Sequence, residues 1–189
     1  AKFYGTEKKK MTIHSKEEMD EILKKLENEE FQIIDIKNSE RTRKAPLPFT
    51  TSTLQQEAAR KLGFTVSQTM MVAQRLYESG FITYMRTDSL NLSSLAISTI
   101  SDEIRSELGE RYLKVRKYHT QSKGAQEAHE AIRPTYISHH DIEGTPQERR
   151  LYNLIWKRTI ASQMADAEIE KTTVDITPSD RPEHFTGSG

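Results

Sequence analysis

The feature that most constrains the fold is a set of helix-start signals concentrated in the middle of the chain. Thr53, Thr65 and Thr145 are each followed three residues later by Gln or Glu, which is the capping-box pattern. Apolar residues at helical spacing come after each of them. Ser93 or Ser94 can begin a further helix. The patterns that start at the three threonines predict helices over residues 53–62, 65–79 and 145–164.

The two ends of the chain look different, because their residues suit strands. Lys2–Ile13 is typical of a hairpin, and residues 31–36 and 169–176 are typical of strands. A basic stretch with prolines over residues 41–48 follows the first strands and is a candidate boundary. We therefore expect an α+β fold. In it, a mainly helical domain is inserted into a β-rich segment, with the helical part at 47–165 and the β-rich parts at 1–46 and 166–189.

The first two predicted helices of the middle region are separated only by Gly63-Phe64 and are followed by a predicted strand. Helix, short turn, helix and strand is the order of a winged helix-turn-helix, which often places its second helix on DNA. An ordinary helical hairpin whose apolar residues fill a core explains the same pattern. The sequence leaves both interpretations open.

Charge and composition exclude several classes of protein. The net charge is zero and there is no cysteine, so neither a disulfide framework nor a thiol-based zinc site is expected. The chain has no apolar run of transmembrane length and no signal-peptide pattern, which is compatible with a cytoplasmic protein. Between Arg41 and Arg86, seven basic residues stand against two acidic ones. Such a stretch suits a phosphate backbone, although a solvated helix face explains it equally well.

The run Gly80–Ser89 carries the strongest chemical signal. Its residues 81–85 are β-branched or aromatic and predict a short strand. Side chains alternate on a strand, so Tyr84 and Arg86 are expected on one face, roughly 6–7 Å apart. A guanidinium clamps a phosphate through two hydrogen bonds and favours a neighbouring phenolate. The pair therefore fits a nucleophile for a phosphodiester, and the alternative is a structural tyrosine at the edge of a strand.

Three segments resemble the motifs of type IA DNA topoisomerases. Residues 82–89 (Ile-Thr-Tyr-Met-Arg-Thr-Asp-Ser) are similar to the active-site motif, and Tyr-Met-Arg is typical of the bacterial members. Residues 48–56 and 126–134 resemble two further motifs, in the order of the family. Weaker similarity covers nearly the whole chain. The resemblance implies a helical domain that bears the nucleophile and is connected through a β-rich arch, which acts as a hinge.

The activity implied by this resemblance is relaxation of negatively supercoiled DNA. Tyr84 would be joined to a 5′-phosphate while a 3′-hydroxyl is released, and Arg86 would bind the cleaved phosphate. This covalent bond keeps the energy of the phosphodiester, so resealing needs no ATP. The competing hypothesis is a non-catalytic winged-helix DNA-binding module in which Tyr84 is structural.

The resemblance also assigns supporting residues. His129 would contact the DNA backbone, and a helix over residues 125–133 would place Arg133 on the same face as His129. A surface helix with balanced charges is the alternative. Thr87, Asp88 and Ser89 are expected to support the site, mainly by orienting the loop. Hydroxyls of residues 50–53 are candidate phosphate donors, although helix capping accounts for at least one of them.

Members of the family hold Mg²⁺ in an N-terminal TOPRIM domain through an Asp-x-Asp-x-Glu motif, which this sequence lacks. We therefore expect no metal ligand in the chain, and His139-His140 has no third ligand at metal-site spacing. The chain begins without Met and ends at Gly189, which we interpret as an excised fragment. The expected partners are a single-stranded segment of negatively supercoiled DNA and the missing TOPRIM domain, with no membrane. We expect a monomer that is inactive, or nearly so, in isolation.

Overall fold

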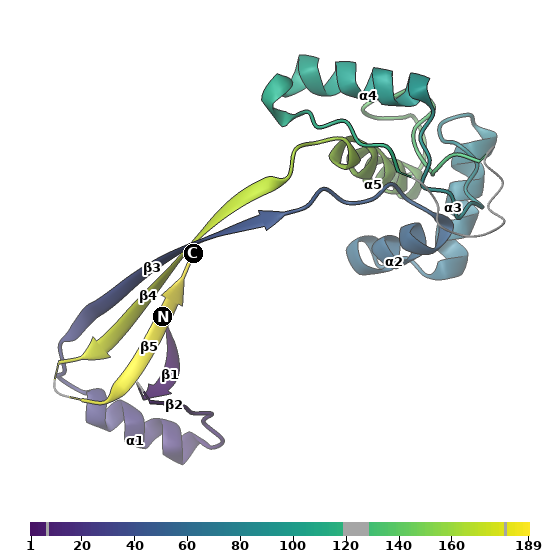
Figure 1. The fold of residues 1–189 in the computed structure, drawn as a ribbon. Coiled ribbons are helices and arrows are strands. Elements are labelled where there is room, and N and C mark those ends of the chain that lie inside the picture. Colours follow the sequence, from purple (N-terminus) through teal and green to yellow (C-terminus); the bar gives the residue numbers. More distant parts are fainter. Residues whose placement is uncertain (7, 119–128, 180) are drawn as a thin grey trace. The chain divides into compact units, whose positions relative to one another are not determined.

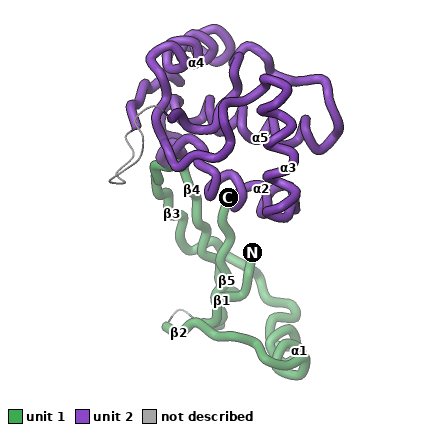
Figure 2. The backbone as a smooth tube through the Cα atoms, turned by 90° about the vertical axis from the view of Figure 1, so that its right-hand side faces the viewer, with its two compact units in different colours: residues 1–43, 168–189 green, residues 44–167 purple. Residues whose placement is uncertain are grey.

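The computed structural model describes residues 1–6, 8–118, 129–179 and 181–189 (Figure 1). The chain divides into two compact units (Figure 2). The first unit contains residues 1–43 and 168–189, and the second contains residues 44–167. The second unit is therefore an insertion in the first, and two passages of the chain connect them.

The first unit is built on a five-stranded sheet with the order β2-β1-β5-β4-β3. Strands β1, β2 and β5 form antiparallel pairs around β1, and β4 pairs antiparallel with β5. Side-chain bonds join Gln32 to Ser179 and Asn38 to Thr172, so β3 and β4 also run in opposite directions. The strands are β1 (Lys2–Thr6), β2 (Lys9–Lys10), β3 (Phe31–Arg43), β4 (Ala167–Pro178) and β5 (Glu183–Ser188).

Aromatic rings hold the middle of this sheet together. Phe185 on β5 contacts both Phe3 and Phe31 edge to face, with ring centroids 5.5 and 5.7 Å apart. Helix α1 (Lys16–Leu26) has no buried residue and lies at one end of the sheet (Figure 1). Its first turn is capped, because the Ser15 hydroxyl accepts a hydrogen bond from the Glu18 N–H. The expected hairpin and both expected strands are present, and β3 is longer than predicted.

The second unit contains the helices expected from the middle of the sequence. They are α2 (Thr51–Leu62), α3 (Val66–Glu78), α4 (Ser94–Glu107), the 3₁₀ turn η1 (Glu110–Tyr112) and α5 (Pro146–Ser162). The predicted caps Thr65, Ser93 and Thr145 all accept the expected backbone hydrogen bonds. The cap predicted at Thr53 is wrong. Helix α2 is capped by Thr50, and Thr53 supplies the reciprocal bond three residues later.

Two clusters of buried apolar residues stabilise this unit. The larger one joins α2, α3 and α5 and includes residues from outside the helices, among them Phe49, Ile82, Met85 and Ile132. The smaller one packs α4 against Ile137 and Ile160, and Trp156 touches both clusters. The core therefore incorporates pieces of all three sequence motifs.

Among the helices of the described ranges, none has the length and apolarity needed to cross a bilayer.

Two further sequence predictions in this unit are wrong. Residues 81–85 form no strand, and their ladder contact is the single bridge between Ile82 and Pro134. The helix expected over residues 125–133 is absent from its described part, since residues 129–133 are extended or irregular and the rest lies outside the described residues. The chain after η1 is anchored to the end of α5. Leu113 bridges Met164, and the Tyr118 hydroxyl donates to the Ser162 carbonyl at 2.7 Å.

Helices α2 and α3 do follow each other across the short Gly63-Phe64 turn. Gly63 adopts a left-handed conformation with φ 70°, and its N–H satisfies carbonyls at the end of α2. Since no strand follows α3 within residues 81–93, the α2–α3 pair has no β-wing directly after it. The confirmed fold is therefore α+β, with a helical unit inserted into an antiparallel sheet.

Candidate active site

Residues 81–89 form an irregular segment that packs on the helical core through Ile82 and Met85. Its side chains alternate between exposure and burial, as on a strand, although the strand itself is absent. Tyr84, Arg86 and Asp88 are exposed, whereas Met85, Thr87 and Ser89 are buried. Both residues of the predicted pair, Tyr84 and Arg86, are therefore accessible to solvent.

The N-terminus of α2 holds this segment from one side. The Thr51 N–H donates to the Thr87 carbonyl at 2.9 Å. The Thr51 hydroxyl donates to the Met85 carbonyl at 2.8 Å and accepts from the Thr87 N–H at 2.8 Å. These bonds lie on both sides of Arg86 in the chain. The motif at residues 48–56 is thus bonded directly to the motif at residues 82–89.

Residues 131–135 hold the segment from the other side. Thr83 exchanges bonds with Arg133, because the Thr83 N–H donates to the Arg133 carbonyl at 2.9 Å and the Thr83 hydroxyl accepts from the Arg133 N–H at 3.0 Å. The same hydroxyl donates to the Ala131 carbonyl at 2.7 Å. Beyond it, the Ile132 N–H donates to the Phe49 carbonyl at 2.8 Å. All three motifs therefore meet at one place.

The phenol ring of Tyr84 packs against a second tyrosine. Tyr77, at the end of α3, contacts Tyr84 edge to face with ring centroids 5.2 Å apart. Tyr77 is 41% exposed and Tyr84 is 42% exposed. One side of the Tyr84 ring is therefore supported by protein while much of the ring stays accessible to solvent. Gly80 allows this approach, since its left-handed φ of 75° ends α3 and turns the chain into the segment.

Thr87 and Ser89 serve the backbone of the segment. The Thr87 hydroxyl accepts from the Ser89 N–H at 3.0 Å, and the Ser89 hydroxyl accepts from the Asn91 N–H at 3.1 Å. Both side chains are buried. Asp88 lies between them and is exposed. The hydroxyls of Thr87 and Ser89 thus bond to the backbone of the turn after Arg86.

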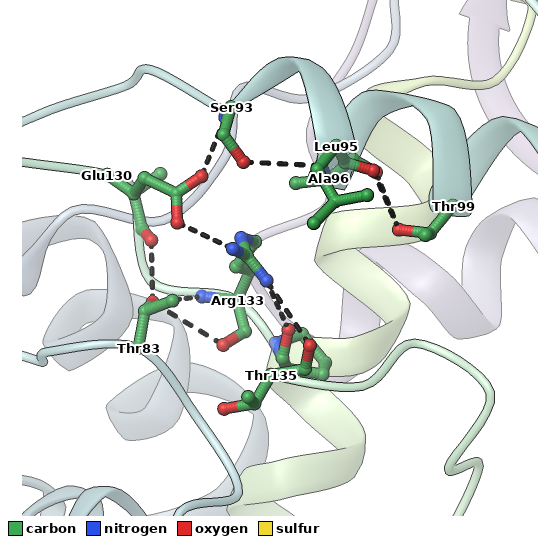
Figure 3. A network of polar contacts seen from close by, with 10 residues as sticks. Thr83, Ser93, Leu95, Ala96, Thr99, Glu130, Arg133 and Thr135 are labelled. Atoms are coloured by element: carbon green, nitrogen blue, oxygen red, sulfur yellow. Dashed lines mark hydrogen bonds and ion pairs between the residues drawn. The ribbon is translucent and has the colours of Figure 1, made fainter.

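Arg133 lies within a network of polar contacts (Figure 3). Its guanidinium donates to the Glu130 carboxylate at 2.6 Å and to the Pro134 carbonyl at 2.9 Å. The other oxygen of Glu130 accepts from the Ser93 N–H at 2.6 Å, at the start of α4. Arg133 is only 16% exposed at its side chain, and its Nε is buried without a hydrogen-bond partner. This arginine therefore joins Thr83 to α4 and does not project into solvent.

Glu130 is held as a carboxylate by this network. Burial alone raises its pKa, but the hydrogen bonds from Arg133 and Ser93 outweigh that effect and bring the pKa below its ordinary value. His129, directly before it, is exposed and lies in irregular backbone. The expected shared helical face of His129 and Arg133 is absent, because the bridge between Phe49 and Ile132 extends this backbone.

The residues around Tyr84 do not form a magnesium site. Across the described ranges, no group of three histidine, aspartate or glutamate side chains is arranged to hold a metal ion. Glu130 already accepts two short hydrogen bonds. The side chains near the segment are mainly hydroxyls and positively charged groups, whereas Mg²⁺ is usually bound through carboxylates and water. No step of the chemistry is therefore derived through a metal here.

Three residues important to this arrangement were not predicted to take part in the site, namely Tyr77, Thr83 and Glu130. Thr51 was predicted only as a candidate phosphate donor, not as a residue that holds the segment. Thr51, Thr83 and Glu130 fall inside the three sequence motifs, so their position was a usable signal. Their role was not readable, because it depends on hydrogen bonds between segments far apart in the chain. Tyr77 lies outside the motifs, and only its ring contact identifies it.

Comparison with known proteins agrees with this geometry. The model of the DNA topoisomerase family matches residues 1–189. DNA topoisomerase 1 of Zymomonas mobilis is 46% identical over 175 residues, which are 92% of this chain and 14% of that protein. DNA topoisomerase 1 of Xylella fastidiosa strain Temecula1 is 51% identical over 159 residues, which are 76% of this chain and 20% of that protein.

A solved structure is similar in three dimensions. Full-length topoisomerase I from Thermotoga maritima matches with a TM-score of 0.72 and 38% identity, over 96% of this chain and 30% of that one. The chain thus spans between 14% and 30% of the length of these relatives. Because the family model matches every residue, the chain belongs to the type IA DNA topoisomerase family of bacteria.

Proposed function

We propose that this chain carries the nucleophile of an enzyme that relaxes negatively supercoiled DNA by transient cleavage of one strand. The observation that carries the proposal is that Tyr84 and Arg86 are both exposed on a segment whose backbone is tied to both other motifs. We also propose that the chain is part of a longer enzyme, since its relatives are several times longer.

The covalent step is an exchange of phosphoesters. The phenolic oxygen of Tyr84 forms a bond to a backbone phosphorus, the bond from that phosphorus to the 3′ oxygen breaks, and the phenolic proton replaces it on the released 3′-hydroxyl. The number of phosphoester bonds is unchanged, so no ATP is needed for the reverse step. The intact strand passes through the gap before resealing. A locally single-stranded segment is the substrate, which negative supercoiling supplies.

Arg86 is proposed to bind the non-bridging oxygens of the cleaved phosphate as negative charge develops on them. Its planar guanidinium forms two parallel hydrogen bonds with a phosphate, which lysine cannot do. His129 is proposed to contact the DNA backbone. Thr87, Ser89 and Arg133 support the site from within, because each is buried or nearly so and bonded to protein. Asp88, which is exposed, is proposed to orient the loop.

Further parts of the enzyme are proposed from the family resemblance alone. A TOPRIM domain elsewhere in the longer enzyme would bind Mg²⁺ and complete the site. The sheet of the first unit would act as the arch and hinge. The enzyme would work as a monomer in the cytoplasm. The chain by itself is expected to relax no plasmid, and relaxation by the purified 189-residue chain would refute that.

The decisive experiment compares Tyr84→Phe with the unchanged sequence in the longer enzyme. The substitution removes only the phenolic oxygen, so covalent DNA adducts should disappear while non-covalent binding of single-stranded DNA stays nearly unchanged. Arg86→Lys keeps the charge but loses the planar fork, and cleavage should fall by roughly a hundredfold. Sequence-selective duplex binding that is indifferent to Tyr84→Phe, without any adduct, would instead identify a winged-helix DNA-binding module.

A further inference from the structure

The hydroxyls of Thr51 and Thr83 contact the backbone next to the two exposed residues of the active-site segment, Tyr84 and Arg86. Thr83 directly precedes Tyr84. Thr51 lies on α2 and contacts the backbone at residues 85 and 87, on either side of Arg86. Both threonines are only partly accessible to solvent. Neither is exposed in the way expected of a phosphate donor.

Each hydroxyl acts both as donor and as acceptor. The Thr51 hydroxyl lies 2.8 Å from the Met85 carbonyl and 3.0 Å from the Thr87 carbonyl, and it accepts from the Thr87 N–H. It has a single proton, and the Thr87 carbonyl already accepts from the Thr51 N–H. The Met85 carbonyl therefore depends on this hydroxyl.

The Thr83 hydroxyl likewise donates one hydrogen bond and accepts another, here with the motif at residues 126–134. Its hydroxyl donates to the Ala131 carbonyl at 2.7 Å and accepts from the Arg133 N–H at 3.0 Å. Arg133 is in turn fixed to Glu130 and the start of α4 (Figure 3). The backbone before Tyr84 is thus tied to a rigid part of the unit by side-chain oxygen atoms.

We propose that Thr51 and Thr83 are positioning residues of the cleavage reaction, which hold the backbone so that the Tyr84 phenol and the Arg86 guanidinium face one phosphate together. The proposal rests on the proposed cleavage function. Because no strand ladder fixes residues 83–87, these hydroxyls replace the missing neighbours of a sheet. Without them, the two side chains keep their chemistry but lose their common orientation.

The test uses Thr51→Val and Thr83→Val in the longer enzyme. Valine has nearly the shape of threonine but can neither donate nor accept. We expect the rate of adduct formation on saturating single-stranded DNA to fall by roughly 10- to 100-fold, as for a misplacement of about 1 Å. The dissociation constant for the same DNA should change by no more than about twofold. Thr51→Ser and Thr83→Ser keep the hydroxyl and should restore the rate to within about threefold.

Thr159→Val is the matched control. Thr159 is 2% exposed, and its hydroxyl donates to the Ile155 carbonyl at 2.9 Å inside α5. This substitution also removes a buried hydroxyl, so it measures the general cost to folding, and it should leave the adduct rate unchanged. If either valine variant fails to fold, the corresponding alanine variant takes its place. Thr51→Val and Thr83→Val enzymes that cleave at the rate of the Thr159→Val enzyme would overturn the proposal.

Amide hydrogen exchange on the 189-residue chain separates the two possible failures. The N–H groups of Thr87 and Arg133 should be protected in the unchanged and serine chains and should exchange faster in the matching valine chains. If the unchanged enzyme forms no adduct while exchange follows the hydroxyls, the cleavage function has failed and the backbone restraint stands alone. If exchange at Thr87 and Arg133 ignores the valines, the positioning role is refuted whatever the enzyme does.

Discussion

Replacing Glu130 with glutamine is expected to lower the free energy of unfolding at neutral pH by about 2 kcal/mol. The carboxylate accepts hydrogen bonds from the Ser93 N–H and from the Arg133 guanidinium, both at 2.6 Å. Glutamine has one acceptor oxygen, so one of these donors must face an amide N–H₂. Each bond to a charged group contributes roughly 1.5–3 kcal/mol, and glutamine keeps one of them in weakened form.

The partial exposure of the Glu130–Arg133 ion pair places the expected loss in the free energy of unfolding between two limits. Side-chain exposures are 16% for Arg133 and 26% for Glu130. Exposed ion pairs contribute about 0–1 kcal/mol, whereas removing one partner of a buried pair costs about 3–5 kcal/mol. This pair is mostly, but not fully, shielded from water. For a domain of this size, about 2 kcal/mol corresponds to a decrease in Tm of roughly 6–8 °C.

The pH dependence gives this prediction its sharpest test. The pKa of Glu130 in the folded chain is below the ordinary value of 4.5. Its contribution to stability is therefore fully present above pH 4.5 and is lost as the pH falls through the folded pKa. Urea denaturation of both chains should show a gap that is constant near pH 7 and closes at acidic pH. Using the difference between the two chains cancels the titration of the other carboxylates.

Asp102→Asn provides the control. Asp102 forms an ion pair with Arg105, and their side chains are 70% and 46% exposed, respectively. That substitution should leave Tm unchanged within error. The reasoning about Glu130 is refuted if the glutamine chain is as stable as the unchanged chain at pH 7. It is also refuted if the gap persists or widens at acidic pH, because the gap would then arise from packing and not from charge.

Three further predictions concern stability. Burial raises the pKa of Tyr152 to about 12 from 10.0, so stability should be lost as the pH rises from 10.0 to 12, and Tyr152→Phe should flatten that loss in urea titrations. Gly80→Ala should cost about 1 kcal/mol in the same assay, because φ is 75° although nothing blocks a Cβ within 4 Å. The Ala45 N–H donates to the Asp166 carboxylate at 3.1 Å and helps hold its pKa below 3.8. Asp166→Asn should therefore speed amide exchange at Ala45 at pH 7, and this difference should persist to pH 3.8 and vanish only as the pH falls further, through the lowered pKa of Asp166.

The helices were predictable because their start signals are local. Thr65 and Thr145 cap their helices through residues three positions away, and the sequence alone shows that pairing. At residues 50–53 several hydroxyls compete for the same role, so local reasoning chose Thr53 where Thr50 is the cap. The residue before this cap, Phe49, has a distant partner, because its carbonyl accepts from the Ile132 N–H, and nothing near Phe49 in the sequence indicates that bond.

The active-site segment shows where local reasoning succeeds and where it fails. Its β-branched and aromatic residues correctly predicted that exposure would alternate through Tyr84, Met85 and Arg86. They wrongly predicted a strand, because a strand needs a partner ladder and the partners here are hydroxyls and an irregular segment. Propensity measures how well a residue suits an extended backbone. It does not say which atoms satisfy that backbone, and those atoms come from residues more than thirty positions away.

The failed helix at residues 129–133 has a consequence for His129. A helix was the reason given for placing His129 near Arg133, and that reason is gone. The structure supplies a different one, since Ala131 accepts a hydrogen bond from Thr83, the residue before Tyr84. Two residues of chain span at most about 7 Å, so the backbone of His129 lies within that distance of Ala131. His129 as a DNA contact stays a prediction, but its proximity to the Tyr84 segment now depends on the Thr83 hydroxyl instead of on helical spacing. Thr83→Val should therefore disturb His129 and Tyr84 together, and a change in the imidazole resonances of His129 in that variant would report the coupling.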